Sequence, residues 1–231
     1  MSEVKLTADS GGGTVAIAGP STTTGNAAVT LTLPQNDGDA DQVLTTNGSG
    51  VTSWSTVSSA VKEQFFTPCD GSTISTSAGD ITIVDVTSDQ AGSNSAWADL
   101  TGSNITYTPP SGTTQVVYEF HFHFTSVDVW NIAHFRLSIG GTEVTDGRTT
   151  YACRERLIGR FCIKWTFNIG GSTTDATGRQ ATWTSGKEIK IEYKDYGSGH
   201  NSKAHNSGYW DQSTGVVVKP CVGITAIGGT S

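Results

Sequence analysis

Residues 115–126 read QVVYEFHFHFTS, and this stretch decides which fold we expect. Side chains alternate between the two faces of a β-strand, so every second residue shares a face. The stretch therefore has an aromatic face of Tyr118, Phe120, Phe122 and Phe124, and a polar face of Glu119, His121 and His123. An entirely aromatic face predicts a core strand between two sheets, whose polar face points to water or to another subunit.

The sequence on both sides of this strand has the same character. Short segments rich in β-branched and aromatic residues alternate with glycine turns, as in antiparallel sandwiches and barrels. The Gly140-Gly141 pair marks a tight hairpin, because glycine adopts the positive φ that such turns need. We therefore expect an all-β chain whose C-terminal part is an antiparallel β-sandwich of the jelly-roll type. The expected strands are 81–86, 104–108, 115–126, 132–139, 142–145, 159–169, 187–194, 214–219 and 222–227.

The first 60 residues differ sharply from the rest in composition. They contain 19 Ser/Thr, 8 Gly and a single aromatic residue, Trp54, whereas the remaining chain holds the other 19 aromatics. This change divides the chain into a short segment of extended strands, residues 1–60, and a domain, residues 61–231. A segment so poor in core-forming side chains needs partners, most simply two further copies of itself.

Local signals within the first 66 residues predict strands and turns. Apolar and polar residues alternate with period two at 14–18 and at 28–33. Turn-forming residues follow at Pro34–Gly38 and at Asn47–Gly50. Residues 57–66 are expected to form either one short helix or a linker into the domain.

Charge and hydropathy exclude several classes of partner. The net charge is −7, with 14 Lys and Arg, so nucleic acid is not an expected ligand, because affinity for phosphates comes mainly from those residues. No apolar run reaches 18 residues, and the first residues lack the apolar core of a secretory signal. We expect neither membrane insertion nor signal-dependent export, and we expect folding in a cytoplasm.

Two stretches of the front segment resemble a known family. Residues 25–34 (GNAAVTLTLP) and 41–54 (DQVLTTNGSGVTSW) are similar to a segment repeated in tail-fibre and other appendage proteins of tailed, especially marine, bacteriophages. The resemblance implies a virion structural protein, assembled in the bacterial cytoplasm and released by lysis. It also implies a homotrimer, since the expected sandwich resembles the trimeric jelly rolls of the tumour-necrosis-factor type.

The resemblance leaves three classes of function open. In the first, residues 1–60 attach to other virion proteins and form a shaft, while the sandwich touches protein or polysaccharide on the host cell. In the second, the chain decorates the capsid or forms a head fibre. In the third, it cleaves polysaccharide, as phage depolymerases do. We favour a non-enzymatic protein, because the sequence has no long repeat, no G-x-S-x-G, no H-E-x-x-H and no phosphate-binding glycine loop.

The segment 195–213 is the candidate recognition tip. Its Gly, Ser and Asn content is typical of an exposed loop, and aromatic, Asn and His side chains there suit sugars or proteins. The alternative places its aromatic pair in the following strand. A separate basic cluster suits either an anionic surface or acids of a neighbouring subunit. The tip residues are His200, Asn201, Lys203, His205, Asn206, Tyr209 and Trp210, and the basic cluster is Arg154, Arg156, Arg160 and Lys164.

His121 and His123 form an H-x-H pattern with a possible metal-binding role. Around a three-fold axis, three such pairs present six imidazoles, which suits an octahedral transition metal. The favoured alternative is two polar residues on a solvated or inter-subunit face, with no cofactor. His134, on the next expected strand, is a candidate to pair across from one of the two.

The cysteines and several tryptophans are expected to have packing roles. No two cysteines form a CxxC pair, and cytoplasmic folding favours free thiols. The less favoured alternative is a disulfide between Cys153 and Cys162, facing each other across a hairpin. The residues concerned are Cys69, Cys153, Cys162, Cys221, Trp97, Trp165 and Trp183.

Overall fold

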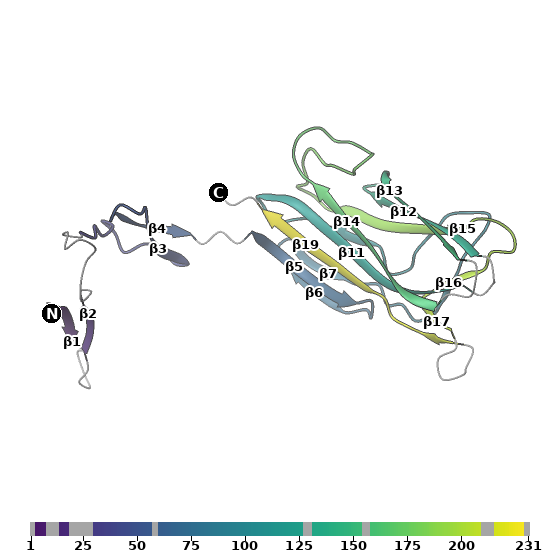
Figure 1. Ribbon diagram of the computed structural model, residues 1–231, viewed down its shortest axis with the longest axis horizontal. Coiled ribbons are helices and arrows are strands. Elements are labelled where there is room, and N and C mark those ends of the chain that lie inside the picture. Colours follow the sequence, from purple (N-terminus) through teal and green to yellow (C-terminus); the bar gives the residue numbers. More distant parts are fainter. Residues whose placement is uncertain are drawn as a thin grey trace. The chain divides into compact units, whose positions relative to one another are not determined.

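The computed structural model describes residues 3–7, 14–18, 30–56, 60–126, 131–153, 158–208 and 215–228. It divides the chain into two compact units, Met1–Ser58 and Ser59–Ser231 (Figure 1). We call the second the sandwich unit and describe each unit by itself.

The first unit consists of two small hairpins. Strand β1 (Glu3–Thr7) pairs with β2 (Thr14–Ala18), and β3 (Gln42–Thr46) pairs with β4 (Thr52–Thr56), all antiparallel. The strand expected at 14–18 and the turn at Asn47–Gly50 are confirmed. The strand expected at 28–33 is wrong over its described part, where Thr32 forms a single parallel bridge.

Very little of the first unit is buried. Among residues 30–56, Thr52 is the only buried side chain, with 7% of its surface exposed. Trp54 is half-buried, and its indole N–H donates to the Asn36 carbonyl. Its ring packs closely on Gly38, where an added Cβ would lie 2.7 Å from Trp54 Cδ2. A two-stranded hairpin with no buried apolar face is marginally stable on its own.

The sandwich unit contains two main sheets. The β11 sheet has the strand order β5-β19-β11-β14, and short strands β16 and β8 extend it beside the end of β11. Its strands are β5 (Val61–Pro68), β19 (Cys221–Gly228), β11 (Thr113–Ser126), β14 (Ile158–Asn168), β16 (Ser202–Ala204) and β8 (Gln90–Ala91). The β12 sheet has the order β10-β15-β12-β13, with β9 also paired to β15. Its strands are β10 (Ile105–Tyr107), β15 (Lys187–Asp195), β12 (Asn131–Ile139), β13 (Thr142–Cys153) and β9 (Ala98–Asp99).

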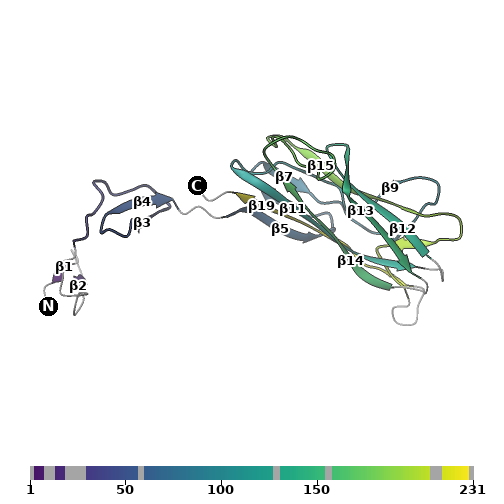
Figure 2. The same ribbon diagram turned by 45° about the horizontal axis from the view of Figure 1, so that its top comes forward.

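The two sheets face each other as a sandwich (Figure 2). The chain passes repeatedly from one sheet to the other, and each sheet mixes strands that are far apart in sequence. This is the strand arrangement of a jelly roll, so the expected all-β sandwich is confirmed. Two further hairpins complete the unit, namely β6 (Thr73–Thr76) with β7 (Gly79–Thr82), and β17 (Asn206–Ser207) with β18 (Val216–Val217).

The core lies where the sequence places it. All four rings of the aromatic face of β11 are at most 1% exposed. Phe122 and Phe124 pack against Phe135 of the opposite sheet, with ring centroids 5.7 and 5.6 Å apart, and Phe135 stacks on Tyr193. These contacts join the two layers. Trp183 is also buried as expected, and Trp165 is half-buried against the core.

Several local expectations are wrong. The helix considered within 57–66 does not form, because residues 61–66 belong to β5, which pairs along β19. The expected strand 81–86 is reduced to its first two residues, since β7 stops at Thr82, and the expected strand 214–219 is reduced to its middle, Val216–Val217 of β18. His134 cannot pair with the H-x-H histidines, because β12 lies in the other sheet, between β13 and β15.

The ends of the sandwich unit differ in what they carry. Val61, Thr113 and Gly228 lie together at one end, since β5 and β11 flank β19 in antiparallel register. At the opposite end β11, β13 and β15 finish and β12, β14 and β16 begin (Figure 1). We call this the loop end. The unit's first and last described strands therefore begin and finish away from these loops.

Candidate functional site

The loop end carries an exposed aromatic ring, Tyr196, directly after β15. Its side chain is 64% exposed, while its backbone N–H donates to the Ile132 carbonyl at 2.8 Å. The rings of His134 and His200 contact it nearly perpendicularly, each with a centroid 5.7 Å away. His134 is held in turn by Thr150, whose Oγ1 lies 2.8 Å from Nδ1. The ring of Tyr196 therefore has an aromatic ring on two sides and stays open to solvent.

Two cations and a second aromatic ring lie further along the same face of the β12 sheet. Lys194 lies beside His134 in the register of β15 and β12. Trp97, half-buried, lies beneath both cations, with Lys194 Nζ 5.1 Å and Arg136 Cζ 4.5 Å from its ring centre. Trp97 is therefore not the interior packing residue that the sequence suggested. We call these side chains the Tyr196 patch: Trp97, His134, Arg136, Lys194, Tyr196 and His200.

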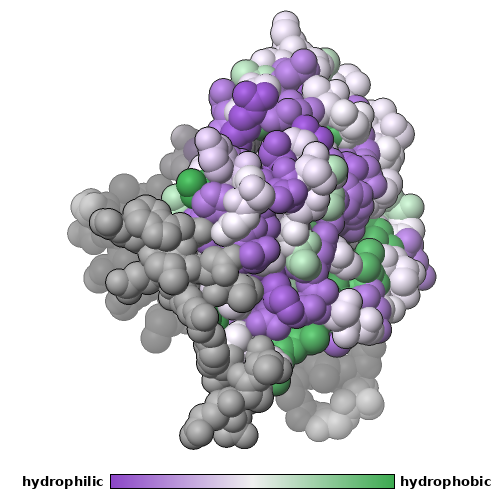
Figure 3. Space-filling model, turned by 90° about the vertical axis from the view of Figure 1, so that its right-hand side faces the viewer, coloured by the Kyte–Doolittle hydropathy of each residue, from purple (hydrophilic) through white to green (hydrophobic). Residues whose placement is uncertain are grey.

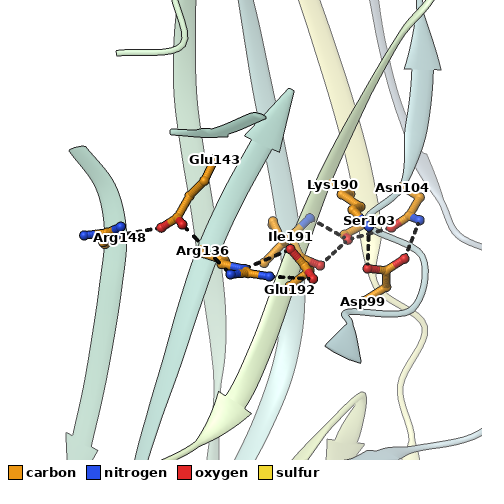
Figure 4. A network of polar contacts seen from close by, with 9 residues as sticks. All are labelled: Asp99, Ser103, Asn104, Arg136, Glu143, Arg148, Lys190, Ile191 and Glu192. Carbon is orange, nitrogen blue, oxygen red and sulfur yellow. Dashed lines mark hydrogen bonds and ion pairs between the residues drawn. The ribbon is translucent and has the colours of Figure 1, made fainter. Parts of the chain in front are cut away.

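An ion-pair network supports one side of this patch. Arg136 donates to both carboxylate oxygens of Glu192, at 2.9 and 3.0 Å, and lies 3.9 Å from Glu143. Hydrogen bonding to Glu192 raises the pKa of Arg136 above its ordinary value. Figure 4 shows that Glu143 also pairs with Arg148. Next to Glu192 in the chain, the backbone of Ile191 bonds with Ser103, and Asn104 and Lys190 both contact Asp99. No carboxylate of the described residues lies within ion-pair distance of Lys194, so its charge stays available.

Figure 3 looks onto the loop end. Its described surface is mostly hydrophilic, with apolar spots at its lower edge. Of the large hydrophobic side chains that are well exposed in the described part of the chain, Tyr196 alone adjoins the outer face of the β12 sheet. The others lie in the first unit or on β5, β14, β18 and the loop after β7.

The segment expected as an exposed recognition tip is partly interior. His205 is fully buried and Asn206 is 6% exposed, because residues 202–204 form β16 and pair with the end of β11. The expectation of an exposed tip is therefore wrong for His205 and Asn206. Their backbone and amide groups are satisfied inside the unit: His205 N–H donates to the His123 carbonyl, and Asn206 Nδ2 donates to Asp89.

The other tip residues are nearer the surface. Lys203 forms an ion pair with Asp89 at 3.0 Å. Asn201 is exposed, and its carbonyl accepts a hydrogen bond from Asn131 at 2.6 Å. His200 is half-buried against Tyr196. Tyr209 and Trp210 lie outside the described residues. Binding by His200, Asn201 and Lys203 stays a prediction.

The polar face of β11 forms a second candidate site. His121 lies between two cysteines in the sheet register, Cys162 on β14 and Cys221 on β19. Its Nε2 is 3.4 Å from Cys162 Sγ and 3.8 Å from a Glu119 oxygen. Because both neighbours approach the same nitrogen, the imidazole cannot relay a proton between them. Burial, with Glu119 next, raises the pKa of the Cys162 thiol, which disfavours the nucleophilic thiolate.

The single chain does not bring His121 and His123 together with further metal-binding side chains among the described residues. Among the described residues, no group of three or more His, Cys, Asp or Glu side chains is placed to hold a metal ion. Burial, with the Arg160 charge next, lowers the pKa of His123, which favours its neutral form. Metal binding shared between copies stays a prediction.

The expected basic cluster is only partly visible and partly neutralised. Lys164 forms an ion pair with Glu119, and Arg160 reaches across β11 to within 3.8 Å of Cys221 Sγ. Arg154 and Arg156 lie outside the described residues. Among the described residues, β13 pairs with β12 and β14 pairs with β11, so no hairpin brings Cys153 beside Cys162.

Two surface hollows lie away from all of these residues. One of about 330 Å³ is lined by residues that include Pro110, Thr113 and Trp183. Another of about 400 Å³ is lined by residues that include Asp80, Thr106 and Glu188. No helix of the described residues is long and apolar enough to cross a membrane.

Comparison with known proteins gives few matches. No family model matches the chain, and no curated protein matches it. Among solved structures, chains in two structures of infectious bursal disease virus match 78% of this chain: the Gx strain at 9% identity and a TM-score of 0.38, and the Gt strain at 12% and 0.32. This chain spans 35% and 40% of those chains. Likenesses this weak carry no argument about fold or function.

Sequence reasoning did not find the Tyr196 patch as a unit. It noticed the Gly- and Ser-rich segment that contains Tyr196 and His200, and it singled out His134 and Trp97 for other reasons. Their proximity depends on β9, β12 and β15 being neighbours in one sheet. No local pattern in the sequence shows that neighbourhood.

Proposed function

We propose that this chain is a structural component of a bacteriophage virion, a trimeric tail-fibre or spike protein without enzymatic activity. Residues 1–60 attach it to other virion proteins and form a short shaft. The sandwich unit is the head, and its loop end contacts the host cell surface.

The observation that carries this proposal is the uncovered apolar surface of the first unit. Five Leu and Val side chains within residues 30–56 are 43–64% exposed, although the same stretch buries only Thr52. Monomeric soluble proteins rarely leave so much apolar surface uncovered without a partner. These side chains are Leu31, Leu33, Val43, Leu44 and Val51.

Second and third copies of the chain are the simplest cover for this surface. Closed rotational symmetry brings the same residues of each copy to a common axis, so a thin segment acquires a shared core. Pairing between copies would also cover the open edges of β3 and β4, which otherwise invite uncontrolled association.

The arrangement of the sandwich unit supports the assignment of its loop end as the contact surface. Its first strand begins at the end opposite the loops, so the segment that precedes it enters there. A unit held at one end presents its other end outward. Loops on a rigid sandwich commonly carry recognition residues.

The experiment that tests the proposal is the absolute mass of the full chain by light scattering in native buffer. We expect three times the 24.2 kDa of one chain. A monomer at all concentrations would overturn the trimeric assignment. A companion chain lacking residues 1–56 should stay folded by circular dichroism but fail to join virions; loss of its folding would contradict the two-part division.

A further inference from the structure

The Tyr196 patch has the features of a preorganised binding site rather than of ordinary protein surface. An exposed tyrosine normally moves freely, and ordering it on binding costs conformational entropy. Here a hydrogen bond holds the main chain of Tyr196, and the rings of His134 and His200 contact its ring and limit its movement, although 64% of its surface is open. A ligand that stacks on this ring therefore avoids most of the entropic cost of ordering it.

The groups around the ring determine what kind of ligand is complementary. A pyranose presents a flat face of C–H groups to an aromatic ring, and its rim carries hydroxyl groups. The imidazole of His134, whose Nδ1 lies 2.8 Å from Thr150 Oγ1, offers its Nε2, which can donate to or accept from a hydroxyl. Lys194, which has no carboxylate partner among the described residues, offers a positive charge on the same surface.

The charge of Lys194 is unusual in its setting. The whole chain carries a net charge of −7, and Arg136 beside it is already paired with Glu192. Trp97 lies beneath Lys194 and holds it by a cation–π contact, on the side of the sheet that bears Tyr196. An unpaired cation beside an open aromatic ring is complementary to a sugar that carries a carboxylate.

We propose that the Tyr196 patch binds a carboxylate-bearing polysaccharide, with a sugar ring stacked on Tyr196 and a carboxylate paired with Lys194. This inference rests on the proposed function, because a head that faces outward is what brings the patch to a cell surface. A protein partner is the less favoured ligand, because lysine is depleted at protein interfaces, although Tyr, Trp and Arg are enriched there, and Lys194 is the cation of the patch without a carboxylate partner among the described residues.

The test measures binding of the full chain to sodium polygalacturonate, with dextran of similar size as the neutral probe, by biolayer interferometry. We expect the wild-type chain to prefer polygalacturonate. Tyr196→Ala should weaken binding about 5- to 10-fold, the range of a single aromatic contact. Tyr196→Phe, which keeps the ring, should stay within about 2-fold of wild type, and Lys194→Gln should abolish the preference over dextran.

Phe66→Ala provides the matched control. Phe66 is 53% exposed on β5 of the other sheet, so its loss removes a comparable exposed ring outside the patch. It should leave polygalacturonate binding unchanged. Because Tyr196 lies on the surface, circular dichroism and melting of Tyr196→Ala should match wild type, which separates loss of binding from loss of folding.

Three outcomes would overturn the inference. They are no wild-type binding to polygalacturonate, equal binding by Tyr196→Ala, and stronger binding to a casein-coated sensor that Tyr196→Ala abolishes, which would identify a protein-binding ring. The mass measurement separates this inference from the proposed function. If the chain is a trimer that does not bind polygalacturonate, only this inference is wrong. If it is a monomer that binds polygalacturonate through Tyr196, only the trimeric assignment is wrong.

Discussion

Residues 30–56 of the first unit and strand β11 of the sandwich unit both carry large apolar side chains, but only those of β11 are buried. In the first unit, the five Leu and Val side chains stay 43–64% exposed. In β11, every ring of the aromatic face is at most 1% exposed. Apolar side chains near a hairpin therefore do not ensure that the same chain covers them.

The difference lies in where the covering strands come from. Strand β11 is paired on one edge by β14 and on the other by β19, and its aromatic face meets β12 and β15 of the second sheet. Strand β3 pairs only with β4, its neighbour in sequence. A chain segment without distant partners of its own must find them on another molecule.

The largest predicted effect tests this contrast in the core. Phe122→Ala should lower the free energy of unfolding by about 3–5 kcal/mol, because it leaves a cavity between the sheets. Leu44 of the first unit is 44% exposed, so Leu44→Ala should change the free energy of unfolding of the sandwich unit by less than about 0.5 kcal/mol. Urea titration followed by near-ultraviolet circular dichroism measures both. Similar losses for the two variants would contradict the contrast.

The next prediction concerns assembly through the first unit. Leu31→Ser combined with Leu33→Ser removes two side chains that are 58% and 64% exposed in the single chain. If other copies of the chain bury these two side chains, the substitutions should weaken the association free energy of each chain by about 3 kcal/mol. The complex should then dissociate at a concentration roughly 100-fold higher or more. Light scattering over a dilution series measures this, and the melting of the sandwich unit should not change. An unaltered mass at every dilution would show that these leucines are not covered.

Acid should act on the sandwich unit through His205. Burial lowers the pKa of this imidazole to about 4, against the opposing effects of the Thr101 carbonyl and the Asp89 carboxylate. The folded pKa lies below the unfolded value, so the unfolded chain binds more protons between them. Stability should therefore fall as the pH drops from about 6.5 towards 4, by roughly 2–3 kcal/mol from this group.

A variant assigns this pH dependence to one group. His205 has a φ of +61°, and Asn is among the few residues that adopt such a backbone conformation readily. His205→Asn should flatten the stability profile between pH 6.5 and pH 5, where the carboxylates contribute little. In this variant, stability should still fall slightly with decreasing pH, because the pKa of His123 is also lowered. An unchanged slope in His205→Asn would exclude His205 as the cause.

The sequence predicted the core better than the surface. The aromatic face of β11 could be recognised because one local pattern, read with period two, names all of its members. The all-β class and the sandwich followed from it. The compositional change near Trp54 likewise marks the poor core of the first unit, because burial there is limited by the supply of apolar side chains.

The loop segment shows why local reading fails elsewhere. Polar composition predicts exposure for residues 195–206, yet His205 and Asn206 lie inside the unit. The end of β11 extends beyond β19, and β16 occupies the vacated edge, so its polar residues become sheet residues. The Tyr196 patch was missed for a related reason, because its members meet only through the pairing of β9, β12 and β15.

The smallest predicted effect tests whether burial of a side chain, and not simply its place in the sandwich unit, determines how much it stabilises the fold. Arg136 and Glu192 form a bidentate pair on the outer face of the β12 sheet, 28% and 16% exposed. Solvent and salt screen such a pair, so Glu192→Gln should cost about 1 kcal/mol or less. The partial loss should shrink further at high salt, where screening weakens the pair.

A double-mutant cycle with Arg136→Gln isolates the pair from the packing of Arg136 on Trp97. We expect a coupling energy well under that of any β11 ring, since water reaches these side chains as it reaches those of the first unit. A coupling of about 3 kcal/mol or more would show that the outer face of the β12 sheet is as tightly constrained as the core. The difference between the first unit and the sandwich unit would then lie in how firmly the surrounding strands hold each side chain, because the exposed fraction alone would no longer distinguish stabilising side chains from others.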